Sequence, residues 1–397
     1  MASSDEDEGV LTQRKVAFIH SEDYINLCDK LPKVQGRASL TTSLIESYGL
    51  LKDRNLSVVS PMRATDNDLA AFHSDEYIEC LKKSSELEDD EDVSQFGLGY
   101  DCPMFDEAYE CVSAIAGGTL AAAEALKSGQ ASIAINWQGG WHHAQRDEAA
   151  GFCYVNDIVL GILKLREKFN RVLYVDLDLH HGDGVEDAFS FTSKVMTVSF
   201  HKYCSGFFPG SGSCLQVGRG KGRYYSLNVS FNDGVTDRPF VEVFNRVMSK
   251  VRSKYKPDAI VCQCGVDTLA GDPMTSFNLT QFGVGHCVKN LLSWNLPTLI
   301  LGGGGYNLVN TARCWTYLTG LILGRLLPND IPDHEHFLAY GPSYQLAVTP
   351  GPQPDMNSQE DLTNQLKKAL GLYIASDSGL TGLGTLIPDL GHHIVSL

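Results

Sequence analysis

One segment of this chain is more informative than any other: Arg171-Val-Leu-Tyr-Val-Asp-Leu-Asp-Leu-His-His-Gly-Asp183. It begins as an apolar run typical of a buried β-strand, and it then places Asp176, Asp178 and His180 two residues apart. Because residues i, i+2 and i+4 of a strand point to one face, we expect two carboxylates and an imidazole side by side. Burying that much charge without a partner is costly. A cation would remove the cost, and Asp with His is a ligand set suited to zinc or iron(II).

The alternative interpretation is that these polar residues form the solvated face of an edge strand. The polar side chains, however, gather only toward the carboxyl end of the segment. The other face is wholly apolar and consists of Leu173, Val175, Leu177 and Leu179. This pattern favours a central strand that ends at an active-site crevice, with a metal site as the hypothesis to test.

Composition limits the class of protein. The chain has 397 residues, 43% hydrophobic and 20% charged, as expected for a globular protein with a sizeable core. Its net charge of −16 argues against direct DNA binding, because phosphate contacts need a basic face. No apolar run has the length of a membrane span, no signal peptide is recognised, and the eleven cysteines follow no disulfide framework. We therefore expect a reduced, intracellular protein without membrane contact.

Strand-like and helix-like segments alternate along the chain, which implies a mostly parallel sheet with helices on both faces. The strand-like runs are 15–19, 132–136, 171–179, 195–199, 259–264 and 297–301. The helix-like segments are 112–127, 156–169, 239–255, 282–294 and 359–375. We expect a disordered acidic tail over 1–14, one domain over 15–375 and a tail of unknown role over 376–397, with an acidic surface loop over 84–92.

Chemistry-bearing residues follow four of these strands. Ligands of open α/β sheets bind outside the carboxyl ends of the strands, so residues just after each strand are candidates for one crevice. The four segments are Trp137-Gln-Gly-Gly-Trp-His-His143, Asp178 with His180, Gly265-Val-Asp267 and Gly302-Gly-Gly-Gly-Tyr306.

The residue types in this crevice indicate hydrolysis at a metal. Asp178, His180 and Asp267 supply three ligands and leave a position open for water, as catalytic zinc sites require. A bound metal lowers the pKa of that water toward neutrality. Attack of water on a carbonyl, such as that of an amide, is the simplest reaction that uses these parts.

The other polar residues fit proton transfer and charge stabilisation. His142 and His143 can serve as general base and acid, and Asp176 and Asp183 are available to orient them. Tyr306 follows four glycines, and its hydroxyl can donate to a developing oxyanion. The alternatives are a buried structural histidine pair and a loop tyrosine.

Four motifs resemble those of the class I zinc-dependent histone deacetylases: Gly139-Gly-Trp-His-His143, Gly151-Phe-Cys-Tyr-Val-Asn156, Tyr174-Val-Asp-Leu-Asp-Leu-His-His-Gly-Asp-Gly184 and Leu301-Gly-Gly-Gly-Gly-Tyr306. The resemblance extends over about residues 15 to 349. It implies a single-domain arginase-like α/β fold, with a parallel central sheet of about eight strands and helices on both faces. It also implies hydrolysis of Nε-acetyl-lysine in histones and other proteins, with release of acetate and a role in chromatin regulation.

The resemblance implies a role for each site residue. Zinc, or alternatively iron(II), would be bound by Asp178, His180 and Asp267. His143 would act as general base and acid beside His142, its electrostatic partner. The remaining assignments are Asp176 orienting His142, Asp183 orienting His143, Tyr306 polarising the acetyl carbonyl, an aromatic slot of Phe152 and Phe208, Met274 on the tunnel wall, the Gly151 carbonyl accepting from the substrate amide, and Asp101 at the rim.

Two potassium sites are also implied by the resemblance. The first would use Asp176, Asp178, His180, Ser199 and the carbonyl of Phe200. The second would use Phe189, Thr192, Val195 and Tyr225. Backbone-carbonyl sites leave little trace in a sequence, so the residues alone do not indicate these sites.

The implied partners are acetylated proteins, including histone tails, in the nucleus and the cytoplasm. Pro273 stands where other class I members carry an arginine used for inositol phosphate at a corepressor interface, which puts corepressor-complex assembly in doubt. One alternative is a deacylase of longer acyl-lysines or of acetylpolyamines. Another is an inactive scaffold that binds acetyl-lysine, although no metal ligand or histidine is missing.

Several further residues receive structural interpretations. His73 and His201 are interpreted as structural histidines. Cys102 and Cys153 are interpreted as buried thiols, with oxidation to a disulfide beside the tunnel entrance as the alternative. Ser39, in Arg-Ala-Ser, resembles a basic-directed phosphorylation site, and its modification stays open.

Overall fold

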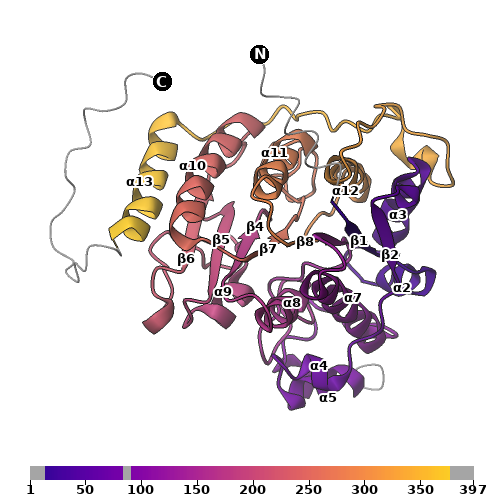
Figure 1. Ribbon diagram of the computed structural model, residues 1–397, viewed down its shortest axis with the longest axis horizontal. Helices are drawn as coiled ribbons and strands as arrows, with labels where there is room; N and C mark the ends of the chain where they lie inside the picture. Colours follow the sequence, from indigo (N-terminus) through magenta and orange to yellow (C-terminus); the bar gives the residue numbers. More distant parts are fainter. Residues whose placement is uncertain (1–13, 84–90, 376–397) are drawn as a thin grey trace.

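In a computed structural model that describes residues 14–83 and 91–375, the chain forms one parallel sheet between two layers of helices (Figure 1). The strand order is β2-β1-β3-β8-β7-β4-β5-β6. The α/β architecture expected from the sequence is confirmed, including the eight strands. The strands are β1 (Val16–Ile19), β2 (Leu56–Val59), β3 (Ile133–Asn136), β4 (Val172–Asp176), β5 (Val195–Lys202), β6 (Ser226–Phe231), β7 (Ala259–Gln263) and β8 (Thr298–Leu301).

Helices cover both faces of this sheet. The helices are α2 (Glu22–Cys28), α3 (Arg37–Ser47), α4 (Asp66–Leu69), α5 (Asp75–Lys83), α6 (Glu91–Ser94), α7 (Ala108–Ser128), α8 (Asp157–Arg166), α9 (Asp183–Phe189), α10 (Asp237–Tyr255), α11 (Gln281–Leu292), α12 (Leu308–Ile322) and α13 (Gln359–Ala375). Short 3₁₀ turns span Leu50–Lys52, Gly220–Gly222 and Phe337–Tyr340. Figure 1 shows α10 to α13 on one side of the sheet and α7 to α9 on the other.

Each face of the sheet has its own hydrophobic core, because side chains alternate along a strand. Leu173 and Val175 of β4 join the core under α10, which includes Phe244. Val172 and Tyr174 of the same strand join the opposite core, under α7 and α8. Burying each such side chain contributes about 1.5–3 kcal/mol, so β4 is held firmly from both sides.

The strands and helices expected from periodicity are present, with small differences at their ends. The segment 359–375 matches α13 in full, and Thr280 caps α11 by accepting from the backbone N–H of Phe282. Strands β2 and β6 were not expected, because β2 is a half-exposed edge strand and β6 carries polar residues within its run. The helices α2 to α6, α9 and the amphipathic helix α12 were also missed.

The expectation for the strand through Arg171–Leu179 is wrong in one respect. Strand β4 ends at Asp176, so Asp178 and His180 lie in the loop that follows and not in the strand. Here the N–H groups of Asp178 and His180 donate to Asp176 Oδ1 and Asp178 Oδ1 over 3.1 and 3.0 Å. These local bonds satisfy the N–H groups of Asp178 and His180 within the loop, while Leu177 and Leu179 still bond to Gln263 and Lys202 of the neighbouring strands.

Several expectations concern residues outside the described ranges. They include most of the acidic tail over 1–14, most of the loop over 84–92 and the tail over 376–397. Among the residues that are described, no helix combines the length and the apolar character needed to cross a bilayer.

Candidate active site

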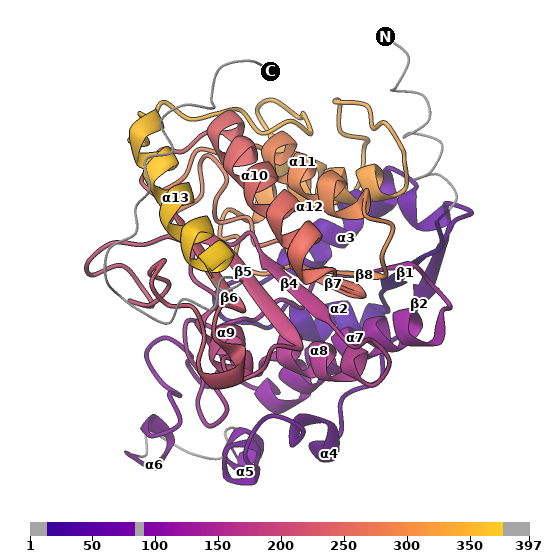
Figure 2. The same cartoon turned by 60° about the vertical axis from the view of Figure 1, so that its left-hand side comes forward.

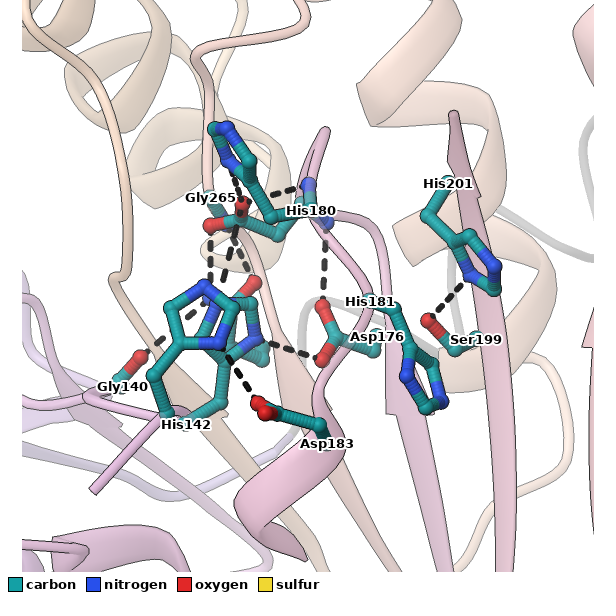
Figure 3. Close-up of polar contacts among 12 residues, drawn as sticks. Gly140, His142, Asp176, His180, His181, Asp183, Ser199, His201 and Gly265 are labelled. Carbon is teal, nitrogen blue, oxygen red and sulfur yellow. Dashed lines mark hydrogen bonds and ion pairs between the residues drawn. The ribbon is translucent and has the colours of Figure 1, made fainter. Parts of the chain in front are cut away.

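The candidate active site lies at the carboxyl ends of four neighbouring strands. Strands β3, β8, β7 and β4 are consecutive in the sheet, and the four segments expected to share one crevice follow them directly. Figure 3 shows His142, Asp176, His180 and Asp183 close together here, while Ser199 and His201 lie on the next strand. The parallel strand order thus brings together residues far apart in the chain.

Asp178, His180 and Asp267 form a compact group of metal-ligating side chains. Nδ1 of His180 lies 2.9 Å from Oδ2 of Asp267 and 3.4 Å from Oδ1 of Asp178. One ligand atom of each residue lies within 4.8 Å of the others, and only 1%, 8% and 1% of the three residues is exposed. Within the described ranges, this is the one group of three or more His, Cys, Asp or Glu arranged in this way.

Small and polar neighbours hold the two carboxylates in place. A Cβ at Gly265 would collide with Asp178, and one at Gly304 would lie 2.7 Å from Oδ2 of Asp267, so only glycine fits at either position. Gln263, the last residue of β7, donates Nε2 to Oδ2 of Asp178 over 2.8 Å, and the Gly304 N–H donates to the same oxygen over 2.9 Å. The backbone is therefore shaped around the carboxylates, and their orientation is fixed by donors behind them.

The protein groups alone leave this trio electrostatically strained. Burial, followed by the charge of Asp178, raises the pKa of Asp267 to about 7. Burial lowers the pKa of His180, but hydrogen bonds and charges from Asp178 and Asp267 outweigh it and raise that pKa to about 10. A divalent cation would favour two ionised carboxylates and a neutral imidazole. The donor set therefore fits a metal such as zinc.

Each histidine of the tandem pair has its own aspartate. Nδ1 of His142 lies 2.8 Å from Oδ2 of Asp176, and Nδ1 of His143 lies 2.7 Å from Oδ1 of Asp183. Oδ2 of Asp176 also accepts from the hydroxyl of Tyr174 over 2.6 Å. These are the two His–Asp pairings that the family resemblance implied, and each one fixes a ring orientation.

The two histidine rings, 4.0 Å apart, differ sharply in their pKa values. Burial lowers the pKa of His142, but the charges of Asp176 and Asp178 prevail and raise it to about 9. Burial and then the positive charge of His142 lower the pKa of His143 to about 4, against the opposing effect of Asp183. These opposite shifts favour the charged form of His142 and the neutral form of His143. In that form Nδ1–H of His143 donates to Asp183, and Nε2 is the basic nitrogen.

Gly151 lies where the backbone meets the ring of His143 and the rim of the site. Its φ is +52°, and a Cβ there would lie 2.6 Å from the His143 ring and 2.8 Å from the Phe208 ring. The rings of His143 and Phe208 are 4.8 Å apart between centroids. Any residue larger than glycine would fill the space in front of the imidazole. Glycine at this position therefore keeps an access path to His143 open.

Tyr306 lies across this space against Phe152, with ring centroids 5.6 Å apart. Burial raises the pKa of Tyr306 well above its ordinary value, and the charges of Asp267 and Asp178 act in the same direction. Its phenol therefore keeps its proton near neutral pH, and its O–H group is available as a hydrogen-bond donor. This is the state that an oxyanion donor needs.

Asp101 and Met274 lie at the periphery of the site. Asp101 lines a small cavity together with Phe152. Met274 packs half-buried against the core, and its N–H donates to Oδ1 of Asp272 over 2.9 Å. Oδ2 of the same carboxylate accepts from the N–H of Tyr306 over 2.8 Å, so Asp272 couples the positions of Met274 and Tyr306.

The residues implied for potassium fall at opposite ends of the sheet. Ser199 is the strand partner of Asp176, so the first group (Asp176, Asp178, His180, Ser199, Phe200) is near the carboxyl ends of β4 and β5. The second group (Phe189, Thr192, Val195, Tyr225) is near the amino ends of β5 and β6. There the Phe189 and Tyr225 carbonyls accept from the N–H groups of Thr192 and Thr197. Potassium binding stays a prediction.

Sequence reasoning missed two residues that shape the site. Arg37 is 1% exposed and donates to the carbonyls of Gly303 and Gly305 over 2.9 and 3.1 Å, which fixes the glycine loop before Tyr306. Nothing in its local sequence marks it as buried. Gln263 did leave a signal, because it is a polar residue within the apolar run Ala-Ile-Val-Cys-Gln-Cys.

His73 and His201 have structural contacts, as interpreted. Nε2 of His73 accepts from the N–H of Asn156 over 3.0 Å, and Nδ1 lies 3.1 Å from the Arg146 carbonyl. His201 lies between the hydroxyl of Ser199 and the carbonyl of Gly212, each at 2.8 Å.

Cys102 and Cys153 are both buried, in line with the preferred interpretation. Sγ of Cys102 lies 3.7 Å from the carbonyl oxygen of Cys153. Burial raises both thiol pKa values, that of Cys102 to about 12, which opposes thiolate chemistry. Ser39 is half-buried, and its hydroxyl and N–H both donate to Asp29.

Comparison with known proteins agrees with this geometry. A model of the histone deacetylase domain matches residues 31–322. The chain is 57% identical to histone deacetylase 8 of Xenopus tropicalis over 89% of its length and 96% of that protein. It is 54% identical to histone deacetylase 8 of Danio rerio, over 93% and 97% of the two chains, and 43% identical to human histone deacetylase 1, over 88% and 73%. With its site geometry and these matches, the chain belongs to the histone deacetylase family.

Proposed function

We propose that this protein hydrolyses the amide between the acetyl group and Nε of acetyl-lysine side chains in proteins, with zinc bound by Asp178, His180 and Asp267. The observation that carries the proposal is the juxtaposition of this buried trio with a histidine, His143, that is paired to Asp183. Membership of the histone deacetylase family supports the same reaction.

When bound at the trio, a zinc ion supplies Lewis-acid chemistry, which lowers the pKa of a water and polarises the acetyl carbonyl. Asp178 and Asp267 provide the negative charge that holds the cation, and His180 provides a nitrogen ligand. Gln263 and the Gly304 N–H hold Asp178 in its binding orientation. Iron(II) suits the same donors and is a second candidate.

His143 transfers the protons of the reaction. Its Nε2 accepts a proton from the attacking water while its Nδ1–H group stays hydrogen-bonded to Asp183. The same nitrogen then returns the proton to the lysine amine as the carbon–nitrogen bond breaks, which leaves acetate and lysine. Protonated His142, held by Asp176, stabilises negative charge that develops beside it.

Tyr306 donates its hydroxyl to the acetyl oxygen as charge develops there. Burial, with the charges of Asp267 and Asp178 acting in the same direction, raises the pKa of this phenol and keeps it protonated. The fixed glycine loop positions the donor before the reaction begins, through Arg37. Preorganised donors of this kind act mainly on the transition state.

The substrate side of the proposal rests on shape and charge. The stem of acyl-lysine is apolar and suits the aromatic rim at Phe208 and Phe152, while the Gly151 carbonyl and Asp101 would bind the amide and the peptide backbone. A net charge of −16 attracts lysine-rich peptides such as histone tails. We extend the proposal to potassium binding and to action in the nucleus and the cytoplasm, but not to corepressor complexes, because Pro273 offers no cation.

The proposal is tested by turnover of a defined acetyl-lysine peptide after metal removal and after return of zinc or iron(II). We expect zinc to restore stoichiometric occupancy and acetate release together. A panel of longer acyl-lysine peptides and acetylpolyamines on the same preparation identifies the substrate class. Preference for an acetylpolyamine would contradict the proposal that proteins are the substrates. Peptide binding without turnover at full metal occupancy would indicate an inactive scaffold.

A further inference from the structure

A second cavity lies at the amino ends of the strands, away from the candidate active site. Its volume is about 440 Å³, and its lining includes Arg171, Lys194, Arg223 and Lys254. We propose that this cavity binds a small anion that carries two or more phosphate groups. The proposal is independent of deacetylation and concerns a part of the molecule that the reaction does not use.

The position of the cavity follows from the sheet. Arg171 directly precedes β4, Lys194 directly precedes β5, and Lys254 is in the last turn of α10. Figure 2 shows β4 to β6 with α10 and α13 packed along them. Because β4 runs from Val172 to Asp176, the cavity and the metal ligands are separated by about 17 Å of strand.

The lining of this cavity is rich in cations, and three of them (Arg171, Lys194 and Arg223) carry the proposal. The lining contains two arginines and two lysines, but no aspartate or glutamate. In the part of the chain that the structure describes, Arg171, Lys194 and Arg223 make no ion pair with a carboxylate. Nε of Arg171 is buried without a hydrogen-bond partner. A buried donor without a partner is costly, so an acceptor from a ligand would be stabilising here.

Two of the cations have local partners that restrict their positions, since Nζ of Lys194 donates to Oδ1 of Asn170 over 2.9 Å and Arg223 lies over an aromatic ring. The guanidinium of Arg223 lies 5.0 Å from the ring centroid of Tyr224, and the rings of Tyr225 and Tyr255 are 5.9 Å apart. The Tyr255 hydroxyl donates to the Val172 carbonyl over 3.1 Å, which ties this wall to β4. Ordering the cations before binding lowers the entropic cost of recognising an anion.

The donor types favour phosphate among anions. A guanidinium presents a planar fork that matches two phosphate oxygens, and ammonium groups add point charges around it. Ser193 and Asn170 also line the cavity and supply neutral polar groups. Its volume admits a small molecule and not a nucleic-acid duplex, and the overall charge of −16 opposes a long polyanion.

The test is titration calorimetry of the full chain with inorganic phosphate, pyrophosphate and tripolyphosphate at constant ionic strength. We expect affinity to rise along this series. The double variant Lys194→Gln with Arg223→Gln should bind tripolyphosphate at least about tenfold more weakly, because it loses two charge-assisted contacts. Lys221→Gln is the matched control, since Lys221 is an exposed cation beside Arg223 that does not line the cavity.

Two comparisons complete the test. Arg171→Lys keeps the charge but removes the planar fork, so it should also weaken binding while leaving the melting temperature within the range of the control. Unchanged affinity in the double variant would overturn the proposal, since binding would then occur elsewhere, for instance at the active-site metal. An equal loss of affinity in Lys221→Gln would show that binding depends on overall charge and not on this cavity, which would contradict the proposal. A triglutamate peptide that binds as tightly as tripolyphosphate would contradict the preference for phosphate.

Discussion

The two ends of the sheet are built from the same strands but carry opposite chemistry. At the carboxyl end, Asp178, His180 and Asp267 are buried and contact one another, with backbone and amide donors behind them. At the amino end, Lys15 and Lys194 are exposed cations that directly precede strands and line cavities of about 490 and 440 Å³.

The difference shows that this fold buries charged side chains at the carboxyl ends of its strands, where they have partners. A buried carboxylate needs partners within a few ångströms, and the glycine-rich loops after β7 and β8 allow the backbone to supply them. At the amino end, Lys15, Lys194 and Arg223 are exposed, so these cations stay in contact with water. One end is therefore suited to chemistry and the other to reversible binding.

The largest expected effect comes from a ligand at the carboxyl end. Asp267→Asn removes one of two charges that hold the cation, so bound zinc and turnover should be lost together. Lys15→Gln, which changes one charge at the amino end, is the control and should keep both. Metal analysis and peptide turnover on the same preparations give the answer, and full zinc occupancy with normal turnover in Asp267→Asn would contradict the assignment.

A large effect without metal loss is expected at Tyr306. Tyr306→Phe removes only the hydroxyl, while the backbone bond to Asp272 remains. We expect kcat to fall about 100- to 1000-fold, with zinc content and melting temperature unchanged. Tyr344→Phe, at a half-buried tyrosine outside the site, is the control. Turnover of Tyr306→Phe within a few-fold of the parent would exclude the donor role, whereas loss of zinc would make Tyr306 structural.

A smaller effect concerns stability at His73. Burial lowers its pKa to about 4 from the ordinary 6.5. Between these pH values the unfolded chain binds more protons, so the stability from burying the neutral ring is fully present above pH 6.5 and is lost as the pH falls toward 4. From pH 7.5 to 5.5 this costs about 1 kcal/mol.

The measurement for His73 is urea denaturation of the metal-free protein at both pH values. His73→Gln keeps an acceptor for the N–H of Asn156 but cannot titrate, so its stability should depend less on pH than that of the parent. His286→Gln, at an exposed histidine, should leave the pH dependence unchanged. Equal pH dependence in the parent and His73→Gln would show that His73 is not the titrating group.

The smallest effect is expected at Met274. Its thioether side chain is flexible, whereas leucine is branched, so Met274→Leu should shift the preference between long and short acyl chains by a few-fold and leave zinc bound. The ratio of kcat/KM for long and short acyl-lysine peptides measures this shift. An unchanged ratio would remove Met274 from the tunnel wall.

Much of the candidate site could be predicted because its residues follow apolar runs. Asp178, His180, Asp267 and Tyr306 stand directly after segments whose apolar character identifies them as strands. The error at β4 has a local cause, since side chain to backbone bonds ended the strand at Asp176 and no periodicity encodes them. The family resemblance, and not local pattern, supplied the particular pairing of each histidine with its aspartate.

The sequence by itself determined the α/β alternation, the residue types at each strand end and the acidic balance of the chain, because these depend on neighbours within a few residues. Only the tertiary structure decided that β3, β8, β7 and β4 are adjacent, that Arg37 reaches the glycine loop, and that cations from distant segments line one cavity. The physical reason is that contacts between remote segments depend on how the whole chain packs, and local patterns carry little of that information.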